Sequence, residues 1–342
     1  MERATLVRLS ESPEARTGEA SVAGLTIRGL RAPDDYSEMN RIANAERERI
    51  GIAFTTTVDQ LADYYKRPSR FDAIRDLAIF ELDGRMAGYA RGGINQVVGG
   101  AKVHEIVPFL DPAVDVRSVF PLMLSVVEAH HRRMAADDPT ANKVLQTFGG
   151  DAAPERDAII VAAGFDAVRH SYTMVRPHVE DLADAELPAG LEIRQVRAED
   201  VRAIWDAGID AFRDAWGFVE PDEDDYARFL TDPMDSQREL WRVAWDGDEV
   251  AGQVRSFINE AENERFGRRR GYTESISVRR PWRRRGLARA LIGASIRALR
   301  QRGMTETALG VDTQNVTGAL ALYESCGYIA VSRTTTFEKP LD

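Results

Sequence analysis

The chain has 342 residues, enough for two ordinary domains, and its 44% hydrophobic and 29% charged residues are typical of a soluble globular protein. The formal charge of −10 disfavours nucleic-acid binding through bulk positive charge. No apolar run reaches the length of a membrane span, and the N-terminus lacks a signal-peptide core. The single cysteine, Cys326, excludes an intrachain disulfide and any multi-cysteine metal site. We expect a cytoplasmic protein with no membrane or nucleic-acid partner and no metal.

Residues 1–23 are polar and without periodicity, and they are expected to form a flexible N-terminal arm. From Leu25 on, the sequence is patterned and then repeats at an offset of 163 to 166 residues: 25–34 matches 191–200, 83–91 matches 246–255, and 163–165 matches 326–328. Three matches at a near-constant offset indicate duplication of a whole domain, since the period is too long for a solenoid. The predicted domains are 24–177 and 191–342, joined by an acidic linker at 178–190.

Both copies predict the same order of elements. A strand (25–30; 191–196) leads to two helices and to a hairpin that turns at Asp-Gly, a strong hairpin signal (76–82 with 85–94; 239–245 with 249–257). A strand, a helix, a strand and a helix follow in each copy. In the first copy they lie at 102–107, 116–134, 143–148 and 155–163, and in the second at 273–278, 286–302, 305–311 and 316–325. This order favours an α/β (α+β) fold with a mixed, largely antiparallel sheet flanked by helices in each domain.

The second copy carries an arginine-rich turn between the strand 273–278 and the helix 286–302. The first amides of a helix lack intrahelical partners, and the helix dipole adds partial positive charge there. Gly286 lets a bulky anion approach the backbone, and Arg283–Arg285 supply full charges. The turn therefore predicts a pyrophosphate site, with an ordinary solvated basic turn as the alternative.

The spacing Arg283-x-x-Gly286-x-Ala288 resembles the acetyl-CoA signature of the GNAT N-acetyltransferase superfamily. A second stretch, from Asn315 through Tyr323 to Gly-Tyr, is similar to the family's Asn-to-Tyr helix, although Asn315 lies one residue farther from the tyrosine than in many members. The resemblance covers most of 191–340 by motif and reaches the first copy only through the repeat. It implies acetyl-CoA as co-substrate, bound by Ile276, Val278, Arg283, Arg284, Arg285, Gly286, Leu287, Ala288, Arg289, Asn315 and Tyr323.

The resemblance also implies direct transfer of an acetyl group to a primary amine of a small molecule in a ternary complex. A backbone N–H near Val278 would polarise the carbonyl, and Tyr323 matches the family tyrosine near the CoA sulfur, where it would protonate the leaving thiolate. Simple packing is the alternative for Tyr323. For the base, Glu274 is the best local candidate, since none of the five histidines lies in the second domain: His104, His130, His131, His170 and His178. Pairing with Arg255 or Arg279 is the alternative role of Glu274.

The acceptor pocket of the family is built by two loops, here 212–225 and 259–271. Trp216 and Phe218, set among carboxylates in the first loop, would bind a cationic amine through ring faces and charge. A solvated acidic loop with one anchoring aromatic residue is the alternative.

The first copy lacks both signatures. It has no glycine from 101 to 148, its turn at 111–117 is acidic, and the second motif is absent: Ile160 stands at the position of Tyr323 and Ala152 at that of Asn315. We therefore predict that 24–177 is a degenerate GNAT-like domain with a structural role, with a regulatory ligand site as the alternative, and that 191–342 is the catalytic GNAT domain.

The layout resembles the mycothiol-synthase type of tandem GNAT protein, which makes a thiol-sugar amine one option for the acceptor. A non-catalytic acyl-CoA-binding or sensor protein is the alternative function. Because the second copy can cover surfaces that a single-domain member would use for dimerisation, a monomer suffices, and a weak homodimer is the alternative.

Overall fold

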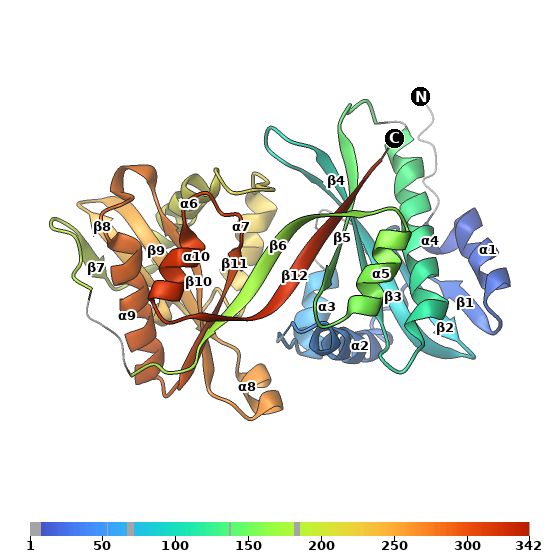
Figure 1. The fold of residues 1–342 in the computed structure, drawn as a ribbon, viewed down its shortest axis with the longest axis horizontal. Helices are drawn as coiled ribbons and strands as arrows, with labels where there is room; N and C mark the ends of the chain where they lie inside the picture. The colour runs from blue at the N-terminus through green and yellow to red at the C-terminus, as the bar shows by residue number, and fades with distance from the viewer. Residues whose placement is uncertain (1–7, 53, 67–71, 137, 181–184, 342) are drawn as a thin grey trace. The chain divides into compact units, whose positions relative to one another are not determined.

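The computed structural model describes residues 8–52, 54–66, 72–136, 138–180 and 185–341. The chain forms two compact units, unit 1 (Met1–His170 with Ser332–Asp342) and unit 2 (Ser171–Val331). Each unit contains a mixed sheet with helices on both faces (Figure 1). The expected α/β fold with one such sheet in each half of the chain is confirmed.

The sheet of unit 1 is antiparallel except for the neighbours β4 and β5. Its strand order is β1 (Leu25–Arg28), β2 (Leu77–Leu82), β3 (Arg85–Gln96), β4 (Lys102–Leu110), β5 (Lys143–Gly150) and β12 (Ile329–Pro340). The helices are α1 (Pro13–Ser21), α2 (Tyr36–Arg49), α3 (Val58–Lys66), α4 (Val116–Ala136) and α5 (Pro154–Ala162). Alternate strand residues face opposite sides, so Ala78 and Phe80 join the core under α4 whereas Leu77 and Ile79 join the core under α2 and α3.

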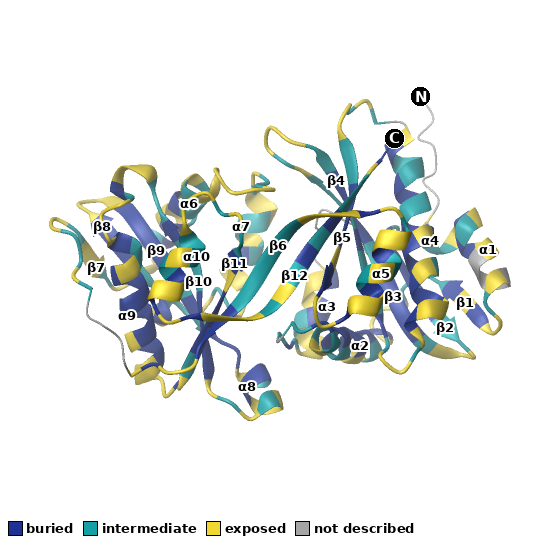
Figure 2. Cartoon of the chain, in the orientation of Figure 1, coloured by how far each residue is buried: buried dark blue, intermediate teal, exposed yellow. Residues whose placement is uncertain are grey.

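Unit 2 repeats this plan, and its single parallel pair is β10 with β11. Its strand order is β6 (Asp166–Arg176), β11 (Glu306–Asp312), β10 (Arg270–Val278), β9 (Glu249–Ile258), β8 (Arg242–Asp246) and β7 (Glu192–Arg194). The helices are α6 (Val201–Phe212), α7 (Glu223–Thr231), α8 (Glu260–Phe266), α9 (Leu287–Gln301) and α10 (Ala319–Ser325). Buried residues line the strands and the inner faces of the helices (Figure 2).

The terminal strands are exchanged between the two repeats. β6 ends the first repeat, yet its residues Ser171–Arg176 pair with β11 of unit 2. β12 ends the second repeat, yet Thr334–Pro340 pair with β5 of unit 1. The predicted domains 24–177 and 191–342 therefore follow the repeat in the sequence. The compact units differ from them, because most of β12 belongs to unit 1 and most of β6 belongs to unit 2. Because the two copies are alike, the sheet of each copy could pair with its own terminal strand or with that of the other copy. The residue pattern of a strand does not show which sheet it joins.

The expected flexible arm at 1–23 is wrong for residues 9–21. Leu9–Glu11 form a turn of 3₁₀ helix and Pro13–Ser21 form α1. The Ser12 hydroxyl caps α1 by accepting a hydrogen bond from the Ala15 amide at 3.1 Å, as expected for an N-cap serine. Leu9 and Ala15 are completely buried in the core of unit 1, so two apolar residues suffice to anchor a mostly polar segment.

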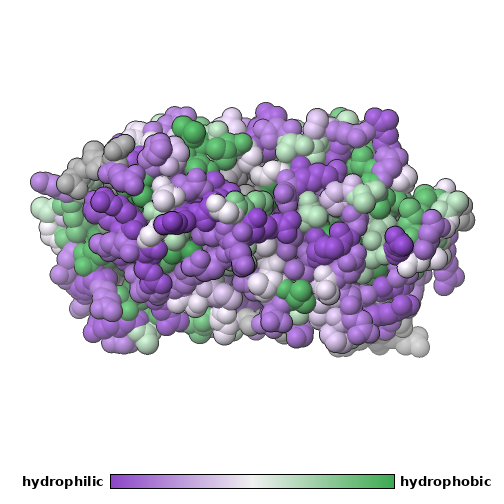
Figure 3. Space-filling view, turned by 90° about the horizontal axis from the view of Figure 1, so that it is seen from below, coloured by the Kyte–Doolittle hydropathy of each residue, from purple (hydrophilic) through white to green (hydrophobic). Residues whose placement is uncertain are grey.

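Charged and polar residues dominate the face shown in Figure 3, where apolar residues occur in small separate groups. No helix in the described ranges is both long and apolar enough to cross a bilayer. Among the same residues, histidine, cysteine and acidic side chains form no group that could hold a metal ion.

Candidate active site

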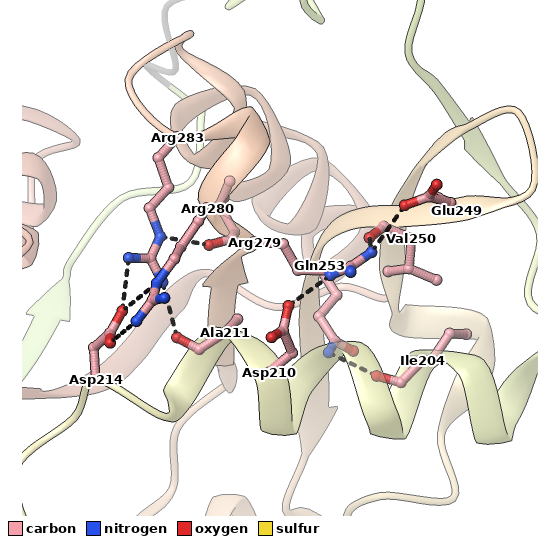
Figure 4. Close-up of polar contacts among 11 residues, drawn as sticks. Ile204, Asp210, Ala211, Asp214, Glu249, Val250, Gln253, Arg279, Arg280 and Arg283 are labelled. Atoms are coloured by element: carbon pink, nitrogen blue, oxygen red, sulfur yellow. Dashed lines mark hydrogen bonds and ion pairs between the residues drawn. The ribbon is translucent and has the colours of Figure 1, made fainter.

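The turn between β10 and α9 is clamped to the end of α6 by two arginines (Figure 4). Arg283 donates from Nε to the Val278 carbonyl at 2.9 Å and from Nη2 to the Ala211 carbonyl at 3.1 Å, and its Nη1 lies 3.1 Å from Asp214. Arg280 makes two further hydrogen bonds to the Asp214 carboxylate. The guanidinium of Arg283 is therefore engaged with protein acceptors, and it holds the turn in place.

The backbone after this clamp presents a row of amide donors. Arg284 and Gly286 adopt left-handed conformations, with φ of 61° and 85°, and α9 begins at Leu287. Within the described residues, the amides of Arg284–Arg289 have no hydrogen-bond acceptor, and the first helical bond runs from the Ala290 amide to the Gly286 carbonyl at 3.2 Å. Free amides at a helix N-terminus form an anion site in which the dipole favours negative charge.

The side chains around these amides leave the site open. A Cβ atom added to Gly286 would meet no atom within 4 Å. Arg284 and Arg285 are exposed, Ala288 is half-buried, and Leu287 is buried in the core, which fixes the start of the helix. Arg284 and Arg285 are therefore free to face an anion at these amides, whereas Arg283, also predicted to supply charge there, binds Val278, Ala211 and Asp214 instead.

Two further residues predicted to bind the cofactor have local roles in the structure. Arg289 links α9 to α10, because its Nη2 donates to the Ser325 hydroxyl at 2.6 Å. The Asn315 side chain accepts the Thr317 amide at 2.8 Å, and this turn precedes Gly318, the N-cap of α10. Contacts of Arg289 and Asn315 with the cofactor stay predictions.

β10 bulges and then separates from β11. Its pairing with β9 shifts register between Glu274 and Ser277, and Ser275 has a φ of 51°. Its parallel pairing with β11 is confined to Arg270–Tyr272. Ile276 and Val278 follow the point of separation and are half-buried against the core of unit 2. A strand that leaves its neighbour in this way exposes backbone groups that an extended ligand can bind.

Glu274 lies at this separation, partly buried between the strands. Its Oε1 accepts a hydrogen bond from the amide of Gly310 on β11 at 2.8 Å. Burial raises the pKa of the Glu274 carboxyl to about 7, although the Gly310 hydrogen bond acts in the opposite direction. A carboxyl with a pKa near neutrality can exchange a proton at physiological pH, as a general base must.

The alternative arginine partners of Glu274 bind other groups. Arg255 donates to the Ser275 hydroxyl at 2.9 Å. Arg279 donates to Asp210 at 2.8 Å, as Figure 4 shows. In the described part of the chain no ion pair joins Glu274 to either arginine, so the alternative of a paired strand-edge glutamate does not describe this side chain.

Tyr323 lies on α10 and is 7% exposed in the apolar core of unit 2. Its ring meets that of Tyr328 edge to face, with centroids 6.3 Å apart. Burial and then the charge of Glu274 raise the pKa of Tyr323 well above its usual range. The phenol therefore stays protonated at neutral pH, and the structure brings Glu274 and Tyr323 within electrostatic reach of each other.

The two loops expected to build the acceptor pocket differ in character. Trp216 is 45% exposed in the loop after α6, and Phe218 is half-buried, with its amide bonded to the Ala215 carbonyl at 3.3 Å. The other loop, 259–271, contains α8, whose Glu262 is completely buried and accepts the Tyr272 hydroxyl at 2.5 Å. The first loop can therefore meet a ligand. In the second loop Glu262 is used internally, whereas Glu260 and Glu264 are exposed.

Two residues of this site were missed from the sequence, Asp214 and Gly310. Asp214 lies in an acidic loop with several carboxylates, and its spacing did not single it out as the partner of Arg280 and Arg283. Gly310 does carry a signal, because glycine inside a strand often marks a close approach of another group. Its amide lies within hydrogen-bond distance of Glu274.

Protein groups fill the equivalent positions of unit 1. At the start of α4 the Asp115 carboxylate accepts the amide of Arg117 at 3.1 Å, so a negative charge already lies where an anion would bind. Between β4 and β5 the buried side chain of Arg156 donates to the carbonyls of Pro108 and Phe148 and forms an ion pair with Glu46. These contacts support the prediction that the first copy has no acetyl-CoA site.

Comparison with known proteins agrees with this geometry. Residues 205–328 match the Acetyltransferase (GNAT) family. A mycothiol acetyltransferase of Saccharomonospora viridis is 27% identical over 281 residues, which are 77% of this chain and 84% of that protein.

Two solved structures share the fold of nearly the whole chain. A GCN5-related N-acetyltransferase from Sphaerobacter thermophilus matches with a TM-score of 0.70 at 21% identity, over 93% of this chain and 96% of its own. A tandem GNAT protein from the clavulanic acid biosynthesis pathway matches with a TM-score of 0.66 at 15% identity, and the match covers 93% of this chain and 99% of that protein. Residues 205–328 are thus similar to the GNAT acetyltransferase family, and the chain shares the fold of these two solved structures over nearly its whole length.

Proposed function

We propose that unit 2 is an N-acyltransferase that moves an acetyl group from acetyl-CoA to a primary amine of a small molecule. The observation that carries this proposal is the position of Glu274, a carboxyl with a pKa of about 7, within electrostatic reach of the protonated phenol of Tyr323. A base and an acid are the two proton-transfer groups that amine acetylation needs. An anion site on the same β10–α9 connection would hold the donor.

The donor would bind through its pyrophosphate. The amides of Arg284–Arg289 are free to donate to phosphate oxygens, and the exposed side chains of Arg284 and Arg285 add positive charge. Acetyl-CoA supplies an activated thioester carbonyl. The separation of β10 from β11 gives its extended arm a place to run along the strand, beside Ile276 and Val278.

The proton transfers follow from the two side chains. An amine is protonated at neutral pH, so its nitrogen must lose a proton before it can attack, and the Glu274 carboxylate accepts that proton. The new C–N bond then forms as the C–S bond breaks, and Tyr323 donates its phenolic proton to the departing thiolate. The second proton on the nitrogen of the new amide then passes to the Tyr323 phenolate, so the net proton released stays on Glu274. This is direct transfer in a ternary complex, without an acyl-enzyme, and general acid–base groups typically contribute about 10²–10⁴-fold each.

For the acceptor, the similarity to a mycothiol acetyltransferase favours an amine on a thiol-bearing sugar. The exposed face of Trp216, in a loop rich in carboxylates, would attract such a cation. The alternative function is a sensor that binds acyl-CoA without turnover.

A thiol-release assay with a panel of primary amines, run beside calorimetric titration of acetyl-CoA, tests the proposal. We expect one site per chain and turnover with at least one small amine. Binding without turnover across the panel would support the sensor, and absence of binding would overturn both functions.

A further inference from the structure

A residue with an unfavourable backbone conformation stands at the bulge of β10. Ser275 has a φ of 51°, and among the described residues other than glycine only Asp83 and Arg284 also have a positive φ. The Cβ atom makes this left-handed conformation costly, so it persists where the surrounding structure holds it. The pairing of β10 with β9 shifts register between Glu274 and Ser277, so Ser275 lies inside the irregularity. The contacts of Ser275 therefore show what holds the bulge.

An arginine on the neighbouring strand holds the Ser275 side chain. Arg255 on β9 donates from Nη2 to the Ser275 hydroxyl at 2.9 Å. In the register of the two strands Arg255 stands opposite Glu274, one residue before the serine. A hydrogen bond from a charged donor is stronger than one between neutral groups, and the Arg255 side chain is only 17% exposed to competing water. The bond therefore opposes rotation of Ser275 out of its left-handed conformation.

The Arg255 guanidinium is itself fixed by three groups. Its Cζ atom lies 4.8 Å from the ring centroid of Phe229 on α7 and 5.8 Å from that of Trp241. Both rings are buried in the core that α6 and α7 form with β8. Nη1 of Arg255 lies 3.4 Å from the Asp235 carboxylate, which balances its charge. A guanidinium held by two rings and a carboxylate has little freedom to move, so it can act as a rigid support for Ser275.

Ser275 in turn supports Glu274. The Ser275 amide donates to the Glu274 carboxylate, which also accepts the Gly310 amide at 2.8 Å. The φ of Ser275 sets the orientation of the planar peptide group that joins it to Glu274. A change to a negative φ would turn the Ser275 amide away from the carboxylate and would let the bulge relax. Since bulges commonly re-aim a side chain beside a functional site, the conformation of Ser275 helps to fix the direction of the Glu274 carboxyl.

Unit 1 shows that a sheet of this kind does not need a bulge here. Its strand β4, the counterpart of β10, pairs with β3 from Lys102 to Leu110 without a register shift. All of β4 lies within the described residues, and none of them has a positive φ. The bulge is therefore a feature of unit 2, and it occurs at the residue next to the proposed base.

We propose that Arg255 is a positioning residue of the candidate active site, which acts on Glu274 through Ser275. The guanidinium keeps Ser275 in its left-handed conformation, and this conformation fixes the bulge and aims the carboxyl of the base toward the reacting amine. Arg255 contacts neither donor nor acceptor in this role. The inference rests on the proposed function for the role of Glu274, whereas the link from Arg255 to the carboxyl can be tested without any activity.

Hydrogen exchange at the Gly310 amide, resolved by NMR of the full-length protein, tests this link because that amide donates to the Glu274 carboxylate. Arg255→Met keeps an unbranched chain against the rings but removes the guanidinium, so this amide should exchange about tenfold or more faster than in the parent. Adding Ser275→Gly should restore slow exchange, because glycine adopts a positive φ without a supporting hydrogen bond. The matched control is Asp83→Gly, at a residue of unit 1 with a φ of 50°, which should restore nothing.

Ser275→Ala covers the case in which Arg255→Met does not fold. It leaves Arg255 with its two rings and Asp235 and removes only the hydroxyl acceptor, so exchange at Gly310 should again become faster. Because both changes remove the same interaction, the double variant should exchange no faster than the faster single variant. Unchanged exchange in Ser275→Ala, or failure of Ser275→Gly to restore slow exchange in Arg255→Met, would overturn the proposal.

Turnover provides a second measurement. In thiol release with the panel of primary amines, Arg255→Met and Ser275→Ala should lower kcat by about tenfold to 10²-fold, as misplacement of a catalytic group does. Calorimetry should find unchanged affinity for acetyl-CoA, and Ser275→Gly should recover kcat in the Arg255→Met protein. A kcat that stays low although exchange at Gly310 recovers would overturn the positioning role. Absence of turnover in the parent would count against the proposed function alone, and the exchange rates would still decide the link between Arg255 and Glu274.

Discussion

The carboxylate of Glu274 accepts the amide of Gly310 at 2.8 Å where β10 and β11 separate. This bond fixes the carboxyl between two strands, where burial raises its pKa to about 7. A glutamate on an exposed strand edge would stay ionised with an ordinary pKa and would be a weaker base. In the proposed function, the separation of the strands would create both the room for the donor and the basicity of the general base.

Glu274→Gln tests the base. Glutamine can still accept the Gly310 amide, so we expect the fold to persist and turnover to fall by about 10²–10⁴-fold. In the parent protein kcat/KM should rise with pH through about 7, as Glu274 loses its proton, and this limb should vanish in the variant. The control is Glu199→Gln, an exposed glutamate in unit 2. An unchanged pH–rate profile in Glu274→Gln would rule the base role out.

Tyr323→Phe tests the acid. The substitution keeps the buried ring and removes only the hydroxyl, so the free energy of unfolding should change little while turnover falls by about 10²–10⁴-fold. Tyr328→Phe, which alters the neighbouring ring 6.3 Å away, is the matched control and should retain activity. Full turnover in Tyr323→Phe would leave this residue a purely structural role.

Much of this site could be predicted because local patterns determine it. The strand 273–278, the turn and the helix after Gly286 follow from alternation, proline and helical spacing, and the structure has β10 and α9 there. The exchange of β6 and β12 could not be predicted, since pairing between distant strands leaves no local pattern. The partners of Arg283 were missed for the same reason, because Ala211 and Asp214 come from α6 and the loop after it.

Gly286→Glu tests the anion site. A carboxylate among the free amides should repel phosphate, so acetyl-CoA binding should weaken by at least about tenfold. Gly303→Glu is a closely matched control. Gly303 lies just beyond the other end of α9, also has a left-handed φ (82°, against 85°), and also has no atom within 4 Å of an added Cβ. Calorimetry that finds equal affinity in both variants would place the donor elsewhere.

Arg283 and Arg284 should differ in what their removal affects. Arg283 bonds to three acceptors, so Arg283→Met should lower the free energy of unfolding of unit 2 by about 1–3 kcal/mol. Arg284 is exposed, so Arg284→Met should weaken acetyl-CoA binding with little change in stability. Urea unfolding followed by tryptophan fluorescence reports unit 2 alone, since all five tryptophans lie in it. Equal stability of the two variants would contradict the clamp.

Unit 1 should lose stability in acid before unit 2 does, because of two buried histidines. The Nδ1 atoms of His104 and His131 lie 3.0 Å apart, and burial lowers the pKa of His104 to about 4 and that of His131 to about 3. Unfolding returns both imidazoles to their ordinary pKa of about 6.5. Between pH of about 6.5 and about 4, the unfolded chain therefore binds more protons than the folded chain does. Stability is therefore present above pH 6.5 and falls by up to about 1.4 kcal/mol per pH unit for each histidine below it.

This acid sensitivity can be measured with two probes. At pH 5, circular dichroism, which reports both units, should show an early unfolding phase that tryptophan fluorescence does not follow. His131→Leu removes the more deeply buried titrating group, so the pH dependence of this phase should be about half as steep. The matched control is His170→Leu, a half-buried histidine of unit 1 that bonds to the Thr335 hydroxyl at 3.2 Å. Coincident transitions at pH 5, or an unaltered slope in His131→Leu, would show that the buried pair does not set the acid stability of unit 1.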